Sequence, residues 1–177
     1  DLDLPEVRIT MGADNSVETV APVQRNDAHR LIEECMIAAN VQAAKFLGRN
    51  KLPTLYRVHP QPELDRFELL RLMLQELGFK VTAEARTQPR ALNRVLAELH
   101  KRPDFAVLAT AVLRSMAQAV YQPLNEGHYG LALDAYAHFT SPIRRYPDLL
   151  VHRAIKAALA GQQYQPVGNW DDVGLHC

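Results

Sequence analysis

The chain has few of the features that would identify its class at once. Its 177 residues include only two cysteines, Cys35 and Cys177, so neither a disulfide framework nor a cysteine metal cluster is expected. No apolar run is long enough to span a membrane, and the first residues do not resemble a signal peptide. These absences predict a cytoplasmic protein without a membrane partner. Cys35 is expected to be a small buried residue of a helix.

An excess of charge of one sign is also lacking. Twenty Lys and Arg residues balance twenty Asp and Glu residues, for a formal net charge of +0. The chain therefore lacks the overall basic field of a stand-alone nucleic-acid-binding module, but an enzyme whose basic channel is assembled from several domains stays compatible. With 47% hydrophobic and 23% charged residues, a folded unit with its own core is expected rather than a disordered chain.

The residue periodicity predicts an α+β fold that is mainly helical and has a small antiparallel sheet. Alternating side chains at 7–11 and 17–23 predict a hairpin that packs on the core. Helices are expected over 27–47, 60–78, 89–100, 104–120 and 148–160. Further strands are expected over 55–58 and 131–139. The tail, residues 162–177, is expected to consist mostly of loops.

The segment 138–148 has the properties of an anion site. Ser141 is a suitable N-cap, and Pro142 suits the first helical position, where a missing N–H costs nothing. Arg144 and Arg145 would then lie in the first turn of a helix, where the helix dipole disfavours cations. An anion such as a phosphate is expected to neutralise them, because the planar arginine fork suits phosphate well.

Alternatives stay open for this segment. The two arginines either bind an anion or pair with Asp148 or Asp134, and the residues alone do not decide between these. Tyr129 and Tyr146 lie nearby and can stack on bases or fill the core. His128 can contact a phosphate, although single histidines are more often structural.

The predicted helix at 27–47 carries a second candidate site. At 100° per residue, Glu33 and Asn40 project to the same side of this helix. The helix is apolar nearly all round, which is typical of a buried helix, and a carboxylate there needs a partner or a ligand. Glu33 is therefore expected either to pair within the protein or to bind a ligand. Asn40 either supports Glu33 or contacts the same ligand.

Several ordered blocks of sequence resemble one family. The strongest are Gly-His-Tyr-Gly-Leu-Ala-Leu at 127–133 and His-Phe-Thr-Ser-Pro-Ile-Arg-Arg-Tyr-Pro-Asp-Leu at 138–149. Further blocks lie at 25–40, 55–59, 113–116 and 118–121. Together they resemble the ribonuclease II/ribonuclease R family, and the ribonuclease R branch is the more similar.

The resemblance implies a processive, Mg²⁺-dependent 3′→5′ exoribonuclease that hydrolyses single-stranded RNA and releases nucleoside 5′-monophosphates. It implies that Arg144 is the catalytic residue at the scissile phosphate and that Glu33 contacts a ribose, a way to prefer RNA over DNA. The predicted RNA-binding residues are Glu33, Asn40, Arg145, Tyr146 and His128.

The resemblance also implies parts that this chain lacks. The family's metal-binding aspartates lie upstream of the block that starts at Arg25. Asp1, Asp3 and Asp14 are the only aspartates before it, and their surroundings do not match that motif, so no metal ligand is predicted here. Residues 1–177 are expected to be the C-terminal portion of an RNB-type catalytic domain. The missing parts, an upstream aspartate cluster and a downstream RNA-binding domain, are the expected partners in the same protein.

Two functions follow from this resemblance. The first is an exoribonuclease of which the chain is a fragment that is inactive by itself. The alternative is a non-catalytic RNA-binding or scaffold protein that keeps the fold without the metal site.

Overall fold

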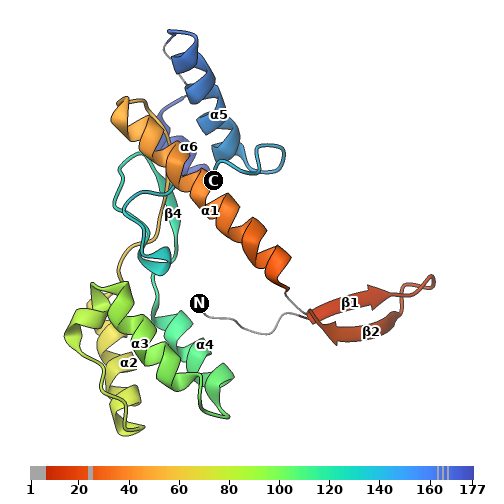
Figure 1. The fold of residues 1–177 in the computed structure, drawn as a ribbon, viewed down its shortest axis with the longest axis vertical. Helices are drawn as coiled ribbons and strands as arrows, with labels where there is room; N and C mark the ends of the chain where they lie inside the picture. Colours follow the sequence, from red (N-terminus) through yellow and green to blue (C-terminus); the bar gives the residue numbers. More distant parts are fainter. Residues whose placement is uncertain (1–6, 24–25, 163, 165, 167) are drawn as a thin grey trace.

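The computed structural model describes residues 7–23, 26–162, 164, 166 and 168–177. The predicted hairpin is confirmed as β1 (Val7–Met11) and β2 (Val17–Pro22), which pair antiparallel. It projects away from the rest of the fold (Figure 1), and its large apolar side chains, such as Ile9 at 56% and Val20 at 61%, are exposed. The expectation that the hairpin packs on the core is wrong, because its pairing is local and no described element covers it.

Helix α1 (Asp27–Arg49) begins where the sequence predicts. The Asn26 side chain caps it by accepting from the His29 backbone N–H at 3.0 Å. The first half of the helix is exposed, including Cys35, so the expected burial of that cysteine is wrong. Only the second half packs against other elements, and Leu47 is fully buried there.

Three helices and a short 3₁₀ helix form one core. These are α2 (Leu64–Glu76), η1 (Ala83–Arg86), α3 (Pro89–Leu99) and α4 (Phe105–Ser115). Their shared interior includes the fully buried Phe67, Leu74, Leu99 and Val112. Tyr129 joins this core, where its hydroxyl donates to the Ala85 carbonyl, and burial raises its pKa to about 12. In Figure 1 the three α-helices lie together, apart from α5 and α6.

A second core lies around the second half of α1. Strands β3 (Tyr56–Val58) and β4 (Val120–Gln122) pair antiparallel, and α5 (Tyr146–Leu159) packs against α1. Helix α6 (Trp170–His176) packs directly on β4. A side chain at Gly174 would bring a Cβ within 2.6 Å of the Tyr121 carbonyl oxygen, so this close approach requires glycine.

Some predicted elements are wrong because tertiary pairing overrides local preference. The helix expected to reach residue 120 ends at Ser115, because residues 120–122 pair with β3. The strand expected at 131–139 is instead the 3₁₀ helix η2 (Tyr129–Leu131) followed by an irregular segment. The tail contains a helix, although parts of 162–177 lie outside the described residues.

The predicted fold class is confirmed. The chain is α+β and mainly helical, with two small antiparallel sheets rather than one. No helix in the described ranges is both long and apolar enough to cross a membrane.

Candidate functional site

The arginine turn (residues 141–145) leads into α5. The backbone N–H groups of Arg144 and Arg145 both donate to the Ser141 carbonyl, at 3.2 and 3.1 Å. Helix α5 then begins at Tyr146, with Arg145 as its N-cap. The two arginines therefore precede the helix instead of forming its first turn.

Pro147 explains why the helix does not begin at Pro142 as predicted. A helix that ran through both prolines would need a hydrogen bond from residue 147 to the Ile143 carbonyl, but Pro147 has no N–H and its ring would clash there. Within the first turn of α5, the missing N–H costs nothing. The predicted N-cap at Ser141 is wrong for the same reason.

A fully buried carboxylate holds the arginine turn from the side of α5. Asp148 Oδ1 accepts from the Ser141 backbone N–H at 2.7 Å and from Arg145 Nη2 at 2.8 Å. Asp148 lies in the first turn of α5, where the helix dipole favours a negative charge. Of the alternatives that the sequence left open, Arg145 thus pairs with Asp148. Asp134 is exposed and has no salt bridge within the described chain.

Arg144 differs from its neighbour. It is exposed at the tip of the turn, beside the fully exposed Ile143. Its guanidinium makes neither a hydrogen bond nor an ion pair with any residue that the structure describes. The turn therefore holds Arg145 by its side chain and leaves the Arg144 guanidinium available for a ligand.

Asn40 connects α1 to the segment before the arginine turn. Its Oδ1 accepts from the backbone N–H groups of Phe139 at 2.9 Å and Thr140 at 3.2 Å. Its Nδ2 donates to the Tyr136 hydroxyl at 2.9 Å. Only 3% of Asn40 is exposed, and both polar atoms of its side chain are bonded within the protein, Oδ1 to backbone and Nδ2 to a side chain. These bonds connect α1 to the backbone before the arginine turn, and contact of Asn40 with RNA stays a prediction.

The other predicted RNA-binding side chains lie at the surface or are half-buried. Glu33 is half-buried on α1, two helical turns or about 10 Å before Asn40. Tyr146 is 44% exposed at the start of α5, next to the arginine turn. Contacts of Glu33 and Tyr146 with RNA stay predictions.

A cluster of histidine and tyrosine rings lies near the arginine turn. His59 stacks on His128 with ring centroids 5.1 Å apart, and Tyr136 contacts His128 and His138 edge-on at 5.2 and 5.6 Å. The Tyr121 hydroxyl is 2.6 Å from His138 Nδ1. His59 and His138 are not among the residues predicted from the sequence, although both lie in the blocks that resemble the family.

Burial keeps two of these histidines uncharged. It lowers the pKa of His128 to about 4, with smaller contributions from the nearby positive charges of His59 and Arg57. Burial, assisted by Arg145, also lowers the pKa of His138 to about 4. His128 Nδ1 accepts from the Leu131 backbone N–H, so its proton is on Nε2. At neutral pH the His128 ring is therefore uncharged, and its contact with RNA stays a prediction.

These pKa shifts predict that stability falls in acid. Because the folded-state pKa values lie below the ordinary 6.5, the unfolded chain binds more protons between pH 6.5 and about pH 4. The contribution of each uncharged histidine to the free energy of unfolding is fully present above pH 6.5. It is lost as the pH falls, by about 2 kcal/mol per histidine. Urea unfolding of the full-length protein at pH 7 and pH 4.5 measures this loss. The loss of stability between the two pH values should shrink by about half in His138→Gln. An equal loss in the wild type and in His138→Gln would contradict the lowered pKa of His138.

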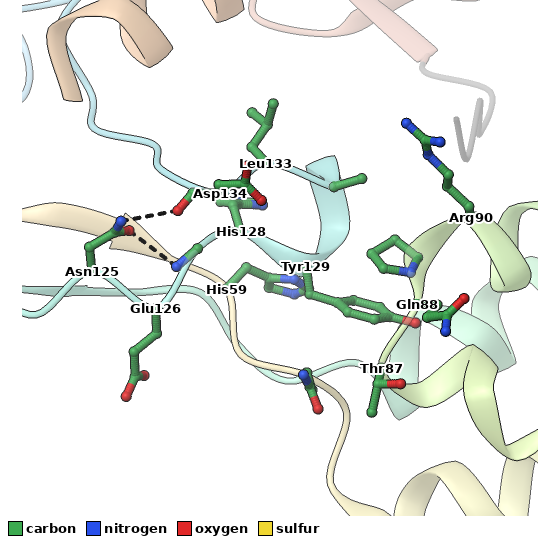
Figure 2. A pocket seen from close by; sticks show the side chains of 14 residues that line it. His59, Thr87, Gln88, Arg90, Asn125, Glu126, His128, Tyr129, Leu133 and Asp134 are labelled. Atoms are coloured by element: carbon green, nitrogen blue, oxygen red, sulfur yellow. Dashed lines mark hydrogen bonds between the residues drawn. The ribbon is translucent and has the colours of Figure 1, made fainter. Parts of the chain in front are cut away.

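Two cavities that share several lining residues, among them His59 and His128, lie beside this cluster. The larger, about 760 Å³, is lined by residues near His59, by the start of α3 and by residues 125–134 (Figure 2). There, Asn125 donates to the Asp134 carbonyl at 3.0 Å and accepts from the Gly127 N–H at 3.1 Å. The smaller, about 590 Å³, reaches Glu34 on α1. Neither cavity includes the arginine turn, so the candidate anion site is an exposed turn rather than an enclosed pocket.

The described residues do not fit a magnesium site. They contain no group of three or more His, Cys, Asp or Glu side chains that could hold a metal ion. Asp14 lies in the exposed hairpin turn, where bonds from Ser16 lower its pKa. Asp1, Asp3 and Arg25 lie outside the described residues. Mg²⁺ is usually held through carboxylates grouped at one point, and the described residues offer no such group.

Comparison with known proteins identifies the family. The RNB domain matches residues 1–161. Ribonuclease R of Escherichia coli (strain K12) is 46% identical over 171 residues, which cover 97% of this chain and 21% of that protein. The apo form of Mycoplasma genitalium RNase R has a TM-score of 0.80 at 29% identity and covers 86% of this chain and 24% of its own. The structure of that enzyme with ribose methylated single-stranded RNA gives the same values.

This chain spans about a fifth of the length of the curated relatives that it matches. Matches over nearly all of its residues agree in sequence, in the RNB domain and in fold. The chain belongs to the RNB family, the family of ribonuclease R.

Proposed function

We propose that the chain is part of a processive 3′→5′ exoribonuclease that hydrolyses single-stranded RNA with Mg²⁺ and releases nucleoside 5′-monophosphates. Identity of 46% to a ribonuclease R supports the reaction class. The similarity to a ribonuclease R bound to single-stranded RNA supports the ligand. These relatives favour the nuclease over a non-catalytic scaffold. A cytoplasmic location is part of the proposal.

The observation that best supports this proposal is the different environment of the two arginines in the turn. Arg145 is paired with the buried Asp148, whereas Arg144 is exposed and has no protein partner in the described chain. A guanidinium held on a short turn can place two donors on the oxygens of one phosphate. In the proposed enzyme, Arg144 binds the scissile phosphate and stabilises the negative charge that develops in the transition state.

The Mg²⁺ ligands and the RNA-binding domain are proposed to lie outside residues 1–177. Mg²⁺ would supply an activated water and stabilise the leaving oxygen. This chain would contribute Arg144 at the phosphate, Glu33 at a ribose, and Tyr146 for stacking beside the arginine turn. Arg145 would hold the turn, although its partly exposed guanidinium can also contact the RNA backbone.

The full-length protein tests this function. With Mg²⁺ it is expected to convert single-stranded RNA to nucleoside 5′-monophosphates, and removal of Mg²⁺ by EDTA should abolish the reaction, because uncompensated phosphate charge has to be neutralised. The 177-residue chain alone should be inactive under the same conditions. Chromatography of the products measures both. Activity that persists in EDTA would contradict metal dependence, and Mg²⁺-dependent activity of the 177-residue chain would show that it holds its own metal site.

Glu33→Gln is expected to reduce the preference for RNA over a matched DNA strand in the full-length enzyme. Only RNA offers a 2′-OH, which a carboxylate accepts more strongly than a neutral amide does. Loss of this charge-assisted bond should cost about 1.5 kcal/mol, or roughly tenfold in the ratio of the two Kd values. Binding of both strands, measured by fluorescence anisotropy without Mg²⁺, gives this ratio. A ratio equal to that of the wild type would remove Glu33 from ribose recognition.

A further inference from the structure

The segment from Phe139 to Arg145 is held at both ends, while its tip is exposed. The first end is bonded to α1 and α5, and the second end is bonded to α5 alone. Between these ends, Ile143 and Arg144 are exposed. Whatever fixes the two ends therefore also fixes where the Arg144 guanidinium can reach.

At the first end, Asn40 is the central partner. One buried oxygen, Oδ1, accepts from two successive backbone N–H groups, those of Phe139 and Thr140. The orientation of the amide is set from its other side, because Nδ2 donates to the Tyr136 hydroxyl. The Phe139 carbonyl accepts from His152 Nε2 at 2.8 Å, and the two rings stack with centroids 4.1 Å apart. The backbone at Phe139 is thus bonded through both its N–H and its C=O.

At the second end, Asp148 has the corresponding role. One buried oxygen, Oδ1, accepts from the Ser141 N–H and from the Arg145 guanidinium. The Ser141 carbonyl in turn accepts from the N–H groups of Arg144 and Arg145 and closes the turn. Two buried side chains on different helices, α1 and α5, therefore accept from three successive backbone N–H groups, those of Phe139 and Thr140 at Asn40 and that of Ser141 at Asp148.

We propose that Asn40 and Asp148 are positioning residues that hold the arginine turn from two helices and so set the place of Arg144 at the scissile phosphate. This inference rests on the proposed function of Arg144 and adds the residues through which it is pre-organised. A group that stabilises a transition state is effective only when its geometry is fixed beforehand. Loss of a positioning residue therefore lowers the rate of the chemical step and leaves binding of RNA, which many other contacts support, nearly unchanged.

Three variants of the full-length enzyme test the role of Asn40. Asn40→Leu has a similar shape but removes the acceptor, and it should lower the single-turnover rate of hydrolysis 10- to 100-fold. Asn40→Asp keeps an oxygen for the Phe139 and Thr140 N–H groups, and its rate should return to within about fivefold of wild type. Tyr136→Phe removes only the bond to Nδ2, so its effect should be the smallest. The Kd for single-stranded RNA, measured without Mg²⁺, should change less than threefold in all three.

A matched core variant separates positioning from general destabilisation. Leu47→Ala opens the same core on the same helix without touching the arginine turn. It should lower the melting temperature at least as much as Asn40→Leu but leave the single-turnover rate within twofold of wild type at a temperature where both are folded. An equal loss of rate in Leu47→Ala and Asn40→Leu would overturn the positioning role.

A double-mutant cycle shows whether Asn40 acts through Arg144. In the Arg144→Ala background, Asn40→Leu should cause less than a threefold further loss of rate, because the group that it positions is already absent. A full additional 10- to 100-fold loss would overturn the inference while leaving Arg144 catalytic. If Arg144→Ala alone does not lower the rate, the proposed function of Arg144 fails and this inference fails with it.

Discussion

Arg144→Lys is expected to lower the single-turnover rate of RNA hydrolysis by at least about 30-fold in the full-length enzyme. The substitution keeps the charge but removes the planar pair of donors, which a residue on the scissile phosphate needs most in the transition state. Loss of one pre-organised donor removes about 2 kcal/mol or more of transition-state stabilisation, which corresponds to a roughly 30-fold lower rate. RNA binding should change much less, because contacts along the rest of the backbone remain.

Arg145→Lys is the matched control, since it makes the same change one residue along the chain. Arg145 donates to the buried Asp148 through Nη2, and a lysine ammonium can supply a donor to the same carboxylate. Its single-turnover rate should therefore stay within about tenfold of wild type. Equal losses at the two positions would mean that the roles of Arg144 and Arg145 are assigned wrongly. An unchanged rate in Arg144→Lys would remove the catalytic role of Arg144.

Asp148→Ala is expected to produce the largest loss of stability among the site variants. It leaves the Ser141 N–H without its acceptor and the half-buried Arg145 guanidinium without its counter-charge. Removing one partner of a buried ion pair costs about 3 kcal/mol or more. Hydrogen–deuterium exchange of peptides from residues 141–159 in the full-length protein measures this loss as faster opening of the arginine turn and α5.

Asp148→Asn is the control for this variant. It keeps a side-chain oxygen for the Ser141 N–H but loses the charge and replaces the second oxygen by an NH2 group, so its loss of stability should be about half that of the alanine variant. Exchange of peptides from α2, which does not contact α5, should be the same in all proteins. If Asp148→Ala leaves the exchange of residues 141–159 unchanged, Asp148 does not hold the turn.

The sequence could predict the elements whose signals are local. The hairpin follows from alternation around a turn, and α1 begins at residue 27, where the sequence predicts its start. The partners of the Arg145–Asp148 pair are only three residues apart along the chain, so this pair was one of the alternatives predicted from the sequence. Such features depend on neighbouring residues, which a reader of the sequence can inspect directly.

What the sequence could not predict depends on distant partners. Residues 120–122 become a strand because they pair with residues 56–58, and no local pattern specifies that pairing. Asn40 contacts backbone that lies 99 and 100 residues later, so its bonds to Phe139 and Thr140 could not be predicted from its position on the helix. Exposure was also misjudged, because the apolar first half of α1 lacks a covering element in the described chain.

The proposed 3′→5′ exoribonuclease activity is tested most directly by observing from which end an RNA is shortened. Single-stranded RNA labelled at its 5′ end is incubated with the full-length protein and Mg²⁺, and the products are separated by length. We expect stepwise shortening from the 3′ end by the wild type, with the label kept on the shrinking strand, and the same pattern at least about 30-fold more slowly in Arg144→Lys. Internal cleavage, release of the label as a mononucleotide at the outset, or RNA that is bound but never shortened would contradict it.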